Sequence, residues 1–178
     1  MAAISNNGAA LKYAAEKIII AYNQVFDLNY TIIRPSALYG ERCISRRVGQ
    51  IFIENALFGK KISINGMGEE KLDFTYILDL IQGISKSIAN EKAYNQIFNI
   101  TYGEGREILK LIEIIKNNFS NIEVEFKERS KLVPVRGTLS NSKSKDLLGY
   151  KSEWPLEKGY QQYINWYKDF FDKKINVS

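Results

Sequence analysis

Helical and strand-like patterns alternate along the whole chain, and this alternation limits its fold more than any other feature. Apolar residues at helical spacing predict helices over 6–26, 47–58, 77–88, 107–119, 142–148 and 155–171. Short apolar or alternating runs predict strands over 29–33, 61–64, 96–100 and 122–126, with an extended segment at 73–76 and a loop at 36–42. Alternating helices and strands are typical of an α/β sheet covered by helices, so we predict that fold class.

The sequence opens on a helix, with no strand and glycine-rich loop ahead of it. A doubly wound nucleotide-binding unit normally begins with that pair, whose loop holds the pyrophosphate of the cofactor. Arg34-Pro35 is expected to end the strand over 29–33, because proline has no N–H for the ladder. The opening of the sequence therefore does not match the usual start of such a unit. No linker-like stretch divides the 178 residues, which predicts a single unit.

The composition excludes several kinds of catalytic and metal site. The chain has no histidine, so it cannot form a Ser-His-Asp triad, a Cys-His pair or an HExxH zinc site. A lone cysteine, Cys43, cannot close an internal disulfide or build a thiolate cage. We expect no metal site, and we expect any proton transfer to use Lys, Tyr, Asp or Glu.

The charge balance is mildly basic. Lys and Arg exceed Asp and Glu by 25 − 20 = +5, and the basic residues are densest at 42–47 and 127–145. Such stretches suit either a solvated surface or a pocket for a phosphate-bearing small ligand. We do not expect nucleic-acid binding, because most tyrosines lie in apolar segments and not among the cations. No apolar run approaches the ~20 residues of a membrane span, and no signal peptide is recognisable, so we expect a cytoplasmic protein without membrane contact.

Four fragments recur in an informative order and spacing. The first is Lys12-Tyr-Ala-Ala-Glu16-Lys17 on the opening helix, twenty-two residues before Arg34. The second is the strand and loop over 31–40, which contains Arg34-Pro35 and ends in Tyr39-Gly40. The third runs over 59–79 and contains Gly66-Met-Gly68 and Leu72-Asp73-Phe74. The fourth spans 134–159, with Arg136-Gly137 followed by Leu148-Gly149-Tyr150.

Together these fragments resemble the C-terminal half of an extended short-chain dehydrogenase/reductase of the NAD-dependent nucleotide-sugar epimerase/dehydratase family. The resemblance implies a partial Rossmann-like sheet with helices, together with the C-terminal substrate-binding lobe, and it implies that the N-terminal glycine-rich half is absent. Residues 1–45 would supply the last Rossmann-type helix and strand, and 46–178 mainly the substrate-binding lobe. Asp73 and Asp79, in the third fragment, are expected to brace that lobe.

The resemblance identifies Lys12 as the lysine of the family's catalytic Tyr-x-x-x-Lys pair. A tyrosine one helical turn before a lysine lies on the same face, where the ammonium lowers the phenol pKa and makes it a base. In this register the tyrosine position holds Gly8, and the usual serine position holds Leu11. A second pair, Tyr13 and Lys17, is an alternative register, although it places Arg34-Pro35 five residues too close. An ordinary amphipathic helix with solvated lysines is a further alternative.

The resemblance also implies cofactor and substrate contacts. Lys12, Pro35 and Ser36 would line the nicotinamide of NAD or NADP. Ala37, Tyr39 and Arg136 would occupy the substrate positions, with Arg136 as the diphosphate ligand. Two positions depart from the family pattern: Ala37 replaces an asparagine that contacts the sugar nucleotide, and Leu72 replaces an arginine that contacts the diphosphate. Lys71 is a poor substitute for that arginine, because neighbouring residues of an extended segment point to opposite faces.

These implications lead to two functional hypotheses. In the first, the chain is the substrate-binding portion of an NAD-dependent nucleotide-sugar epimerase or dehydratase, inactive in isolation and with weak or no NAD binding. In the second, it is a degenerate, non-catalytic module that binds sugar nucleotides or another protein. For either we expect a nucleotide-diphosphate sugar as ligand. We also expect some self-association, through the opening helix or the aromatic final helix.

Overall fold

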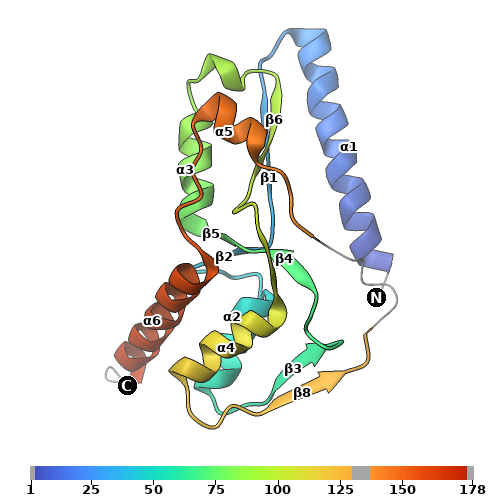
Figure 1. The fold of residues 1–178 in the computed structure, drawn as a ribbon. Coiled ribbons are helices and arrows are strands. Elements are labelled where there is room, and N and C mark those ends of the chain that lie inside the picture. Colours follow the sequence, from blue (N-terminus) through green and yellow to red (C-terminus); the bar gives the residue numbers. More distant parts are fainter. Residues whose placement is uncertain (1–2, 130–136, 176–178) are drawn as a thin grey trace.

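One part of the molecule is a parallel strand pair between helices (Figure 1). The computed structural model describes residues 3–129 and 137–175. Strands β1 (Thr31–Pro35) and β6 (Gln96–Ile100) pair in parallel, from Thr31 opposite Gln96 to Pro35 opposite Ile100. Helix α1 (Ala3–Phe26) lies on one side of this pair, and α3 (Ile77–Ser87) and α5 (Ser142–Leu148) lie on the other. A short 3-10 helix, Glu91–Ala93, leads into β6.

The second part is built from three helices and short strand pairs. Helices α2 (Val48–Leu57), α4 (Ile108–Asn118) and α6 (Leu156–Ile175) pack against one another. Beside them β3 (Ile62–Asn65) pairs in parallel with β8 (Val124–Lys127), and β4 (Lys71–Asp73) pairs antiparallel with β7 (Gly105–Glu107). Strands β2 (Leu38–Tyr39) and β5 (Thr75–Tyr76) form a parallel pair where the two parts meet.

Two buried apolar clusters correspond to the two parts. The smaller joins α3, β6 and α5 through residues that include Leu80, Phe98 and Leu148. The larger surrounds α6, where Tyr160, Tyr163 and Ile164 are fully buried among side chains of α2 and α4. The final helix is therefore mainly a core helix, as its apolar spacing predicts.

The predicted helices all form, with small shifts at their ends, and three details of the strands differ. Pro35 lies inside β1 and not beyond it. It is the last residue of the strand, where a missing N–H removes little from the ladder. The loop at 36–42 contains β2, and β7 was not predicted, because its sequence Gly-Arg-Glu has no apolar alternation. Both strands are two or three residues long and form only through partners distant in sequence.

Helix α1 carries an apolar stripe that other described residues leave uncovered. Leu11, Ile18, Tyr22 and Val25 are each more than half exposed. The spacing of these residues correctly predicts a helix, but the described parts of the chain do not provide the surface that the stripe would bury. None of the described helices combines the length and apolarity needed to cross a membrane.

Candidate functional site

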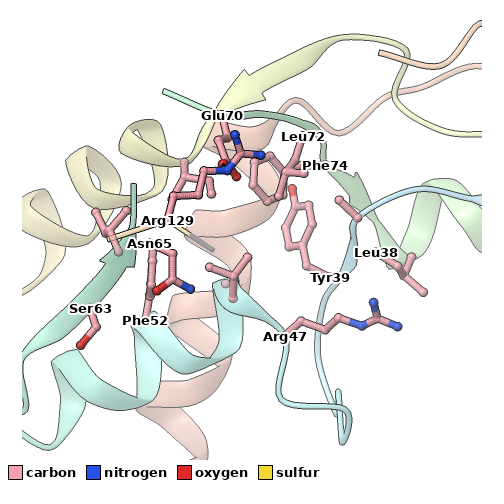
Figure 2. Close-up of a pocket in the computed structure, with 15 residues that line it drawn as sticks. Leu38, Tyr39, Arg47, Phe52, Ser63, Asn65, Glu70, Leu72, Phe74 and Arg129 are labelled. Carbon is pink, nitrogen blue, oxygen red and sulfur yellow. Dashed lines mark ion pairs between the residues drawn. The ribbon is translucent and has the colours of Figure 1, made fainter. Parts of the chain in front are cut away.

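A cavity of about 280 Å³ opens where β2, α2, β3, β4 and α4 converge (Figure 2). Its apolar lining comes mainly from Ala37, Leu38, Val48, Phe52, Ile64, Leu72, Phe74 and Ile108. Polar groups enter from Arg47, Ser63, Asn65, Glu70 and Arg129. A mostly apolar hollow with a few polar groups is the usual form of a small-molecule site. The cavity therefore suits a ligand with an apolar part and a charged part.

Aromatic side chains build the wall next to β2. The ring of Tyr39 packs edge-on against Phe74, with centroids 6.3 Å apart, and against Tyr160 at 6.1 Å. Burial raises the pKa of Tyr39 well above its ordinary value, with smaller contributions from Tyr76 and nearby carboxylates. Tyr39 is consequently neutral at physiological pH and acts as a wall of the site, not as a proton acceptor.

The polar side of the cavity is formed by an ion pair. Arg129 Nε contacts Glu70 Oε1, and each side chain is about one-third exposed. Figure 2 shows the guanidinium of Arg129 extending toward Leu72 and Phe74. Arg47 lies at the rim, with Nε donating to Ser45 Oγ at 3.1 Å, and its guanidinium extends toward Leu38. The cavity thus holds an anchored cation on one side and an apolar surface opposite.

Two buried aspartates brace the backbone at β4 and at the start of α3, as the third fragment predicts. Asp73 accepts hydrogen bonds from the N–H groups of Gly103 and Leu139 at 3.1 and 3.2 Å. Asp79 accepts from Glu153 and Trp154 N–H at 2.9 and 3.2 Å. Burial raises the pKa of both carboxyl groups, and the backbone donors partly oppose this rise. These carboxylates connect β4 and α3 to later segments of the chain.

A second group of residues lies where α1 meets β1. Arg34 Nε donates to Glu16 Oε1 at 2.7 Å, and this pairing lowers the pKa of Glu16 and raises that of Arg34. Lys12 is exposed on α1, one helical turn before Glu16, so both side chains leave the same face of the helix. The ion pair therefore holds the Lys12 turn toward the Arg34-Pro35-Ser36 segment.

The position expected for the catalytic tyrosine is occupied by Gly8. None of the described atoms lies within 4 Å of a Cβ built on Gly8, so packing against them does not require a glycine. In the alternative register, Lys17 Nζ lies 5.0 Å from the centroid of the Tyr13 ring. That contact places the ammonium over the ring face. The pair is thus a surface cation–π contact on α1.

The structure brings some of the expected site residues together and separates others. Ala37, Tyr39 and Leu72 line the cavity. Lys12, Pro35 and Ser36 belong to the separate α1–β1 edge and do not line it. Arg136 lies outside the described residues.

Sequence reasoning missed Glu70 and Arg129 as parts of the site. Its only signal for Arg129 was the basic stretch at 127–145. Glu70 carried no signal, because its role depends on a partner some sixty residues away in the sequence.

Comparisons with known proteins point to one family. Residues 6–101 match the NAD dependent epimerase/dehydratase family. The UDP-glucuronate 4-epimerase of Thermodesulfobacterium geofontis is 29% identical, over 95% of this chain and 53% of that protein.

Solved structures agree with this match. The Thermotoga maritima UDP-glucose 4-epimerase with UDP-glucose has a TM-score of 0.82 and 25% identity, covering 90% of this chain and 52% of the other. The Bacillus cereus UDP-glucuronic acid 4-epimerase in complex with UDP-glucuronic acid and NAD has a TM-score of 0.83 and 25% identity, covering 89% and 51%. The chain spans about half the length of the curated relatives it matches.

Proposed function

The chain belongs to the NAD-dependent epimerase/dehydratase family, and from this we propose that it forms the nucleotide-sugar-binding portion of a sugar epimerase or dehydratase. The observation that carries the proposal is the cavity, which three of the substrate-related positions, Ala37, Tyr39 and Leu72, line together. Its apolar part suits a base and ribose, and its cationic side suits a diphosphate. Relatives of similar fold are described in complex with UDP-sugars, which supports this ligand class.

The described residues fit NAD in part. Lys12, Pro35 and Ser36 would hold the nicotinamide end, because the Glu16–Arg34 ion pair keeps the Lys12 turn beside the Arg34-Pro35-Ser36 segment. When bound, NAD would supply hydride-transfer chemistry at its nicotinamide ring. Lys12 would donate a hydrogen bond to the adjoining ribose. Gly8 stands at the position of the family's tyrosine, so this position has no phenol that could accept the proton of the sugar hydroxyl. The 178 residues also contain no glycine-rich pyrophosphate loop.

We accordingly expect this chain to bind UDP-sugars but to bind NAD or NADP weakly or not at all, and to be inactive by itself. Isothermal titration calorimetry with UDP-glucose and, separately, with NAD tests this expectation. Binding of UDP-glucose with little heat from NAD is the expected result. Micromolar affinity for NAD would contradict the incomplete cofactor site, and failure to bind any UDP-sugar would overturn the proposed ligand.

The alternative, a non-catalytic sugar-nucleotide binding or interaction module, is favoured by Gly8, Leu11, Ala37 and Leu72. These four positions lack the side chains that the family uses in chemistry or ligand contact. None of the described atoms lies within 4 Å of a Cβ at position 8, so the variant Gly8→Tyr should fold normally. This variant restores the tyrosine that the family has at this position. The two functions are distinguished by whether the complete protein turns over UDP-glucose in the presence of NAD. Chromatography of the nucleotide sugars measures this turnover. Turnover without the Gly8→Tyr change would exclude the alternative.

We also propose how the chain is divided and assembled. Residues 1–45 would contribute the last elements of the nucleotide-binding sheet, and 46–178 mainly the substrate-binding lobe, with α3, β6 and α5 returning to the β1 side. The exposed stripe of α1 supports self-association, because isolated apolar surface of this kind favours burial. Light scattering that gives a concentration-independent monomer would contradict it.

A further inference from the structure

The loop between β2 and α2 stands at the rim of the cavity and is anchored at both of its ends. At its start, Tyr76 Oη donates to Glu41 Oε1 at 2.5 Å. At its end, the carbonyl of Arg47 accepts from Ile51 N–H at 2.9 Å, which fixes this rim residue to the first turn of α2. Figure 2 shows the chain that leads to Arg47 lying to one side of the cavity. We call residues 42–46, between these two anchors, the lid segment.

Both ends of the lid segment have a strained backbone. Arg42 has φ +60° and Arg46 has φ +46°, in the left-handed region that residues other than glycine avoid because the Cβ approaches a carbonyl oxygen. Such residues persist only where the surrounding structure holds them, and they are common at ligand clamps and switch regions. Here the two strained residues flank three others, so rotations at two points of the backbone would move the segment as a unit.

The contact that holds the lid segment outward is weak. Arg46 Nη2 lies 3.5 Å from Glu54 Oε2, and the arginine side chain is 68% exposed. Exposed ion pairs of this kind contribute little stability. Glu54 also accepts hydrogen bonds from Gln50 Nε2 and Tyr167 Oη, so its carboxylate keeps two donors if Arg46 leaves. The segment can therefore move without leaving a partly buried carboxylate unpaired.

The tip of the lid segment is an isoleucine that lies almost entirely in water. Ile44 is 95% exposed. It lines a second hollow of about 270 Å³ together with Leu38, and Leu38 also lines the main cavity beside Val48. Moving Ile44 onto this apolar rim would remove its surface from water, which is favourable. A rotation toward the cavity thus gains apolar contact and relieves the backbone strain in the same step.

We propose that the lid segment closes over the cavity when a nucleotide sugar is bound. This inference rests on the proposed function and adds a moving part to it. On closing, Arg42 and Arg46 return to negative φ, Arg46 leaves Glu54, and Ile44 packs at the rim. The ligand shifts the equilibrium because the closed lid segment contacts it and the outward one does not. Closing then excludes water from the cavity and slows ligand release.

The first test uses trypsin, which cleaves after arginine and lysine, on the complete 178-residue chain. UDP-glucose should slow cleavage after Arg42 and Arg46 by about tenfold, because proteolysis follows the population of the open form. Cleavage after Lys151, an exposed residue between α5 and α6, is the control and should be unchanged. Mass spectrometry of the fragments measures the three rates. Equal rates after Arg42 and Arg46 with and without saturating UDP-glucose would overturn the inference.

The second test removes the apolar tip and measures UDP-glucose affinity by calorimetry. Ile44→Ser should weaken binding by about threefold or more, because the closed form loses a buried apolar side chain. The side chain is exposed in the outward form, so the variant should fold normally. Ile88→Ser, at an exposed isoleucine that follows α3, is the matched control and should leave the affinity unchanged.

The third test changes the strain at one end of the lid segment. Arg42→Gly should bind UDP-glucose about threefold more weakly than Arg42→Ala, because both lose the charge but only glycine relieves the left-handed strain and so favours the outward form. Ala89→Gly, at φ +52° outside the cavity, relieves the same strain and should not change the affinity.

The outcomes separate the lid from the nucleotide site. If UDP-glucose binds the unmodified chain, but Ile44→Ser leaves its affinity unchanged and Arg42→Gly equals Arg42→Ala, the lid is wrong and the nucleotide site stands. If the unmodified chain does not bind UDP-glucose, the proposed function itself fails, and the inference fails with it.

Discussion

Asp79 is a single side chain that holds two segments together. It is almost fully buried on α3, and its two oxygens accept the backbone N–H groups of Glu153 and Trp154. Asp79→Ala would leave both donors without this acceptor, so we expect a loss of about 2–4 kcal/mol in the free energy of unfolding. Asp79→Asn keeps one acceptor oxygen and should lose less. Urea unfolding measures both, and the exposed Asp146→Ala serves as a control within about 0.5 kcal/mol.

Residues differ in how well the sequence predicts their roles. The bracing by Asp73 and Asp79 was predictable, because both stand in a specific run beside the glycine turn and buried carboxylates need donors. Arg129 was not predictable, because its place depends on the β3–β8 pairing and on Glu70. Periodicity describes one segment at a time and does not report which segments meet.

At the scale of elements, α1 is attached to β1 by few contacts, and the Glu16–Arg34 ion pair is one of them. Glu16→Gln removes this ion pair and should lower the free energy that holds α1 against β1. The loss should be at most about 1 kcal/mol, because Arg34 is nearly half exposed and solvent weakens the pair. Amide hydrogen exchange of residues 10–26 should then rise by about fivefold at most. Gln24→Ala, at an exposed position of the same helix, is the control and should not change it.

The pH dependence of this attachment follows from the lowered pKa of Glu16. A carboxyl whose pKa is lowered by folding stabilises the folded state above its ordinary pKa, and this contribution is lost as pH falls through the lowered value. The difference in thermal stability between the unmodified chain and Glu16→Gln should thus be largest at pH 7 and disappear in acid. Thermal melts followed by circular dichroism check it, and a difference that persists below the lowered pKa would contradict the role of the pair.

Among the elements, the long helices were predictable and the short strands were not. Helix α5 has the predicted bounds, and Gly149 follows it in the left-handed conformation that ends a helix. Strands β2 and β7 are two or three residues long, too short to show a period, whereas β5 lies within the extended segment predicted at 73–76. Their pairing is set by the packing of the larger elements around them.

At the scale of the whole molecule, the alternation of helices and strands correctly predicted the α/β class. It did not predict which apolar helix faces are buried in the structure. The stripe on α1 and the stripe on α6 show similar apolar spacing in the sequence. In the structure Tyr160 and Tyr163 are buried, whereas Leu11 and Val25 are more than two-thirds exposed. An amphipathic pattern shows that one face of a helix is apolar, but what that face contacts depends on the tertiary structure.

The aromatic core makes the whole fold sensitive to alkali. Burial raises the pKa values of Tyr39, Tyr76, Tyr160 and Tyr163, and that of Tyr167 to about 12. Unfolded tyrosines ionise near pH 10, so above that pH the unfolded chain binds fewer protons than the folded one. Stability is therefore fully present below about pH 10 and falls as pH rises, by up to about 1.4 kcal/mol per pH unit for each such tyrosine.

We expect these buried phenols to ionise only when the molecule unfolds. In an alkaline titration, most of the phenolate absorbance at 295 nm should therefore appear in the same cooperative step in which the helical circular dichroism is lost. Tyr76→Phe removes one raised phenol, together with its 2.5 Å hydrogen bond to Glu41, and should make the pH dependence of unfolding shallower above pH 10. Phenolate absorbance that reaches completion while the circular dichroism stays native would show that the core admits hydroxide without unfolding, contrary to its close aromatic packing.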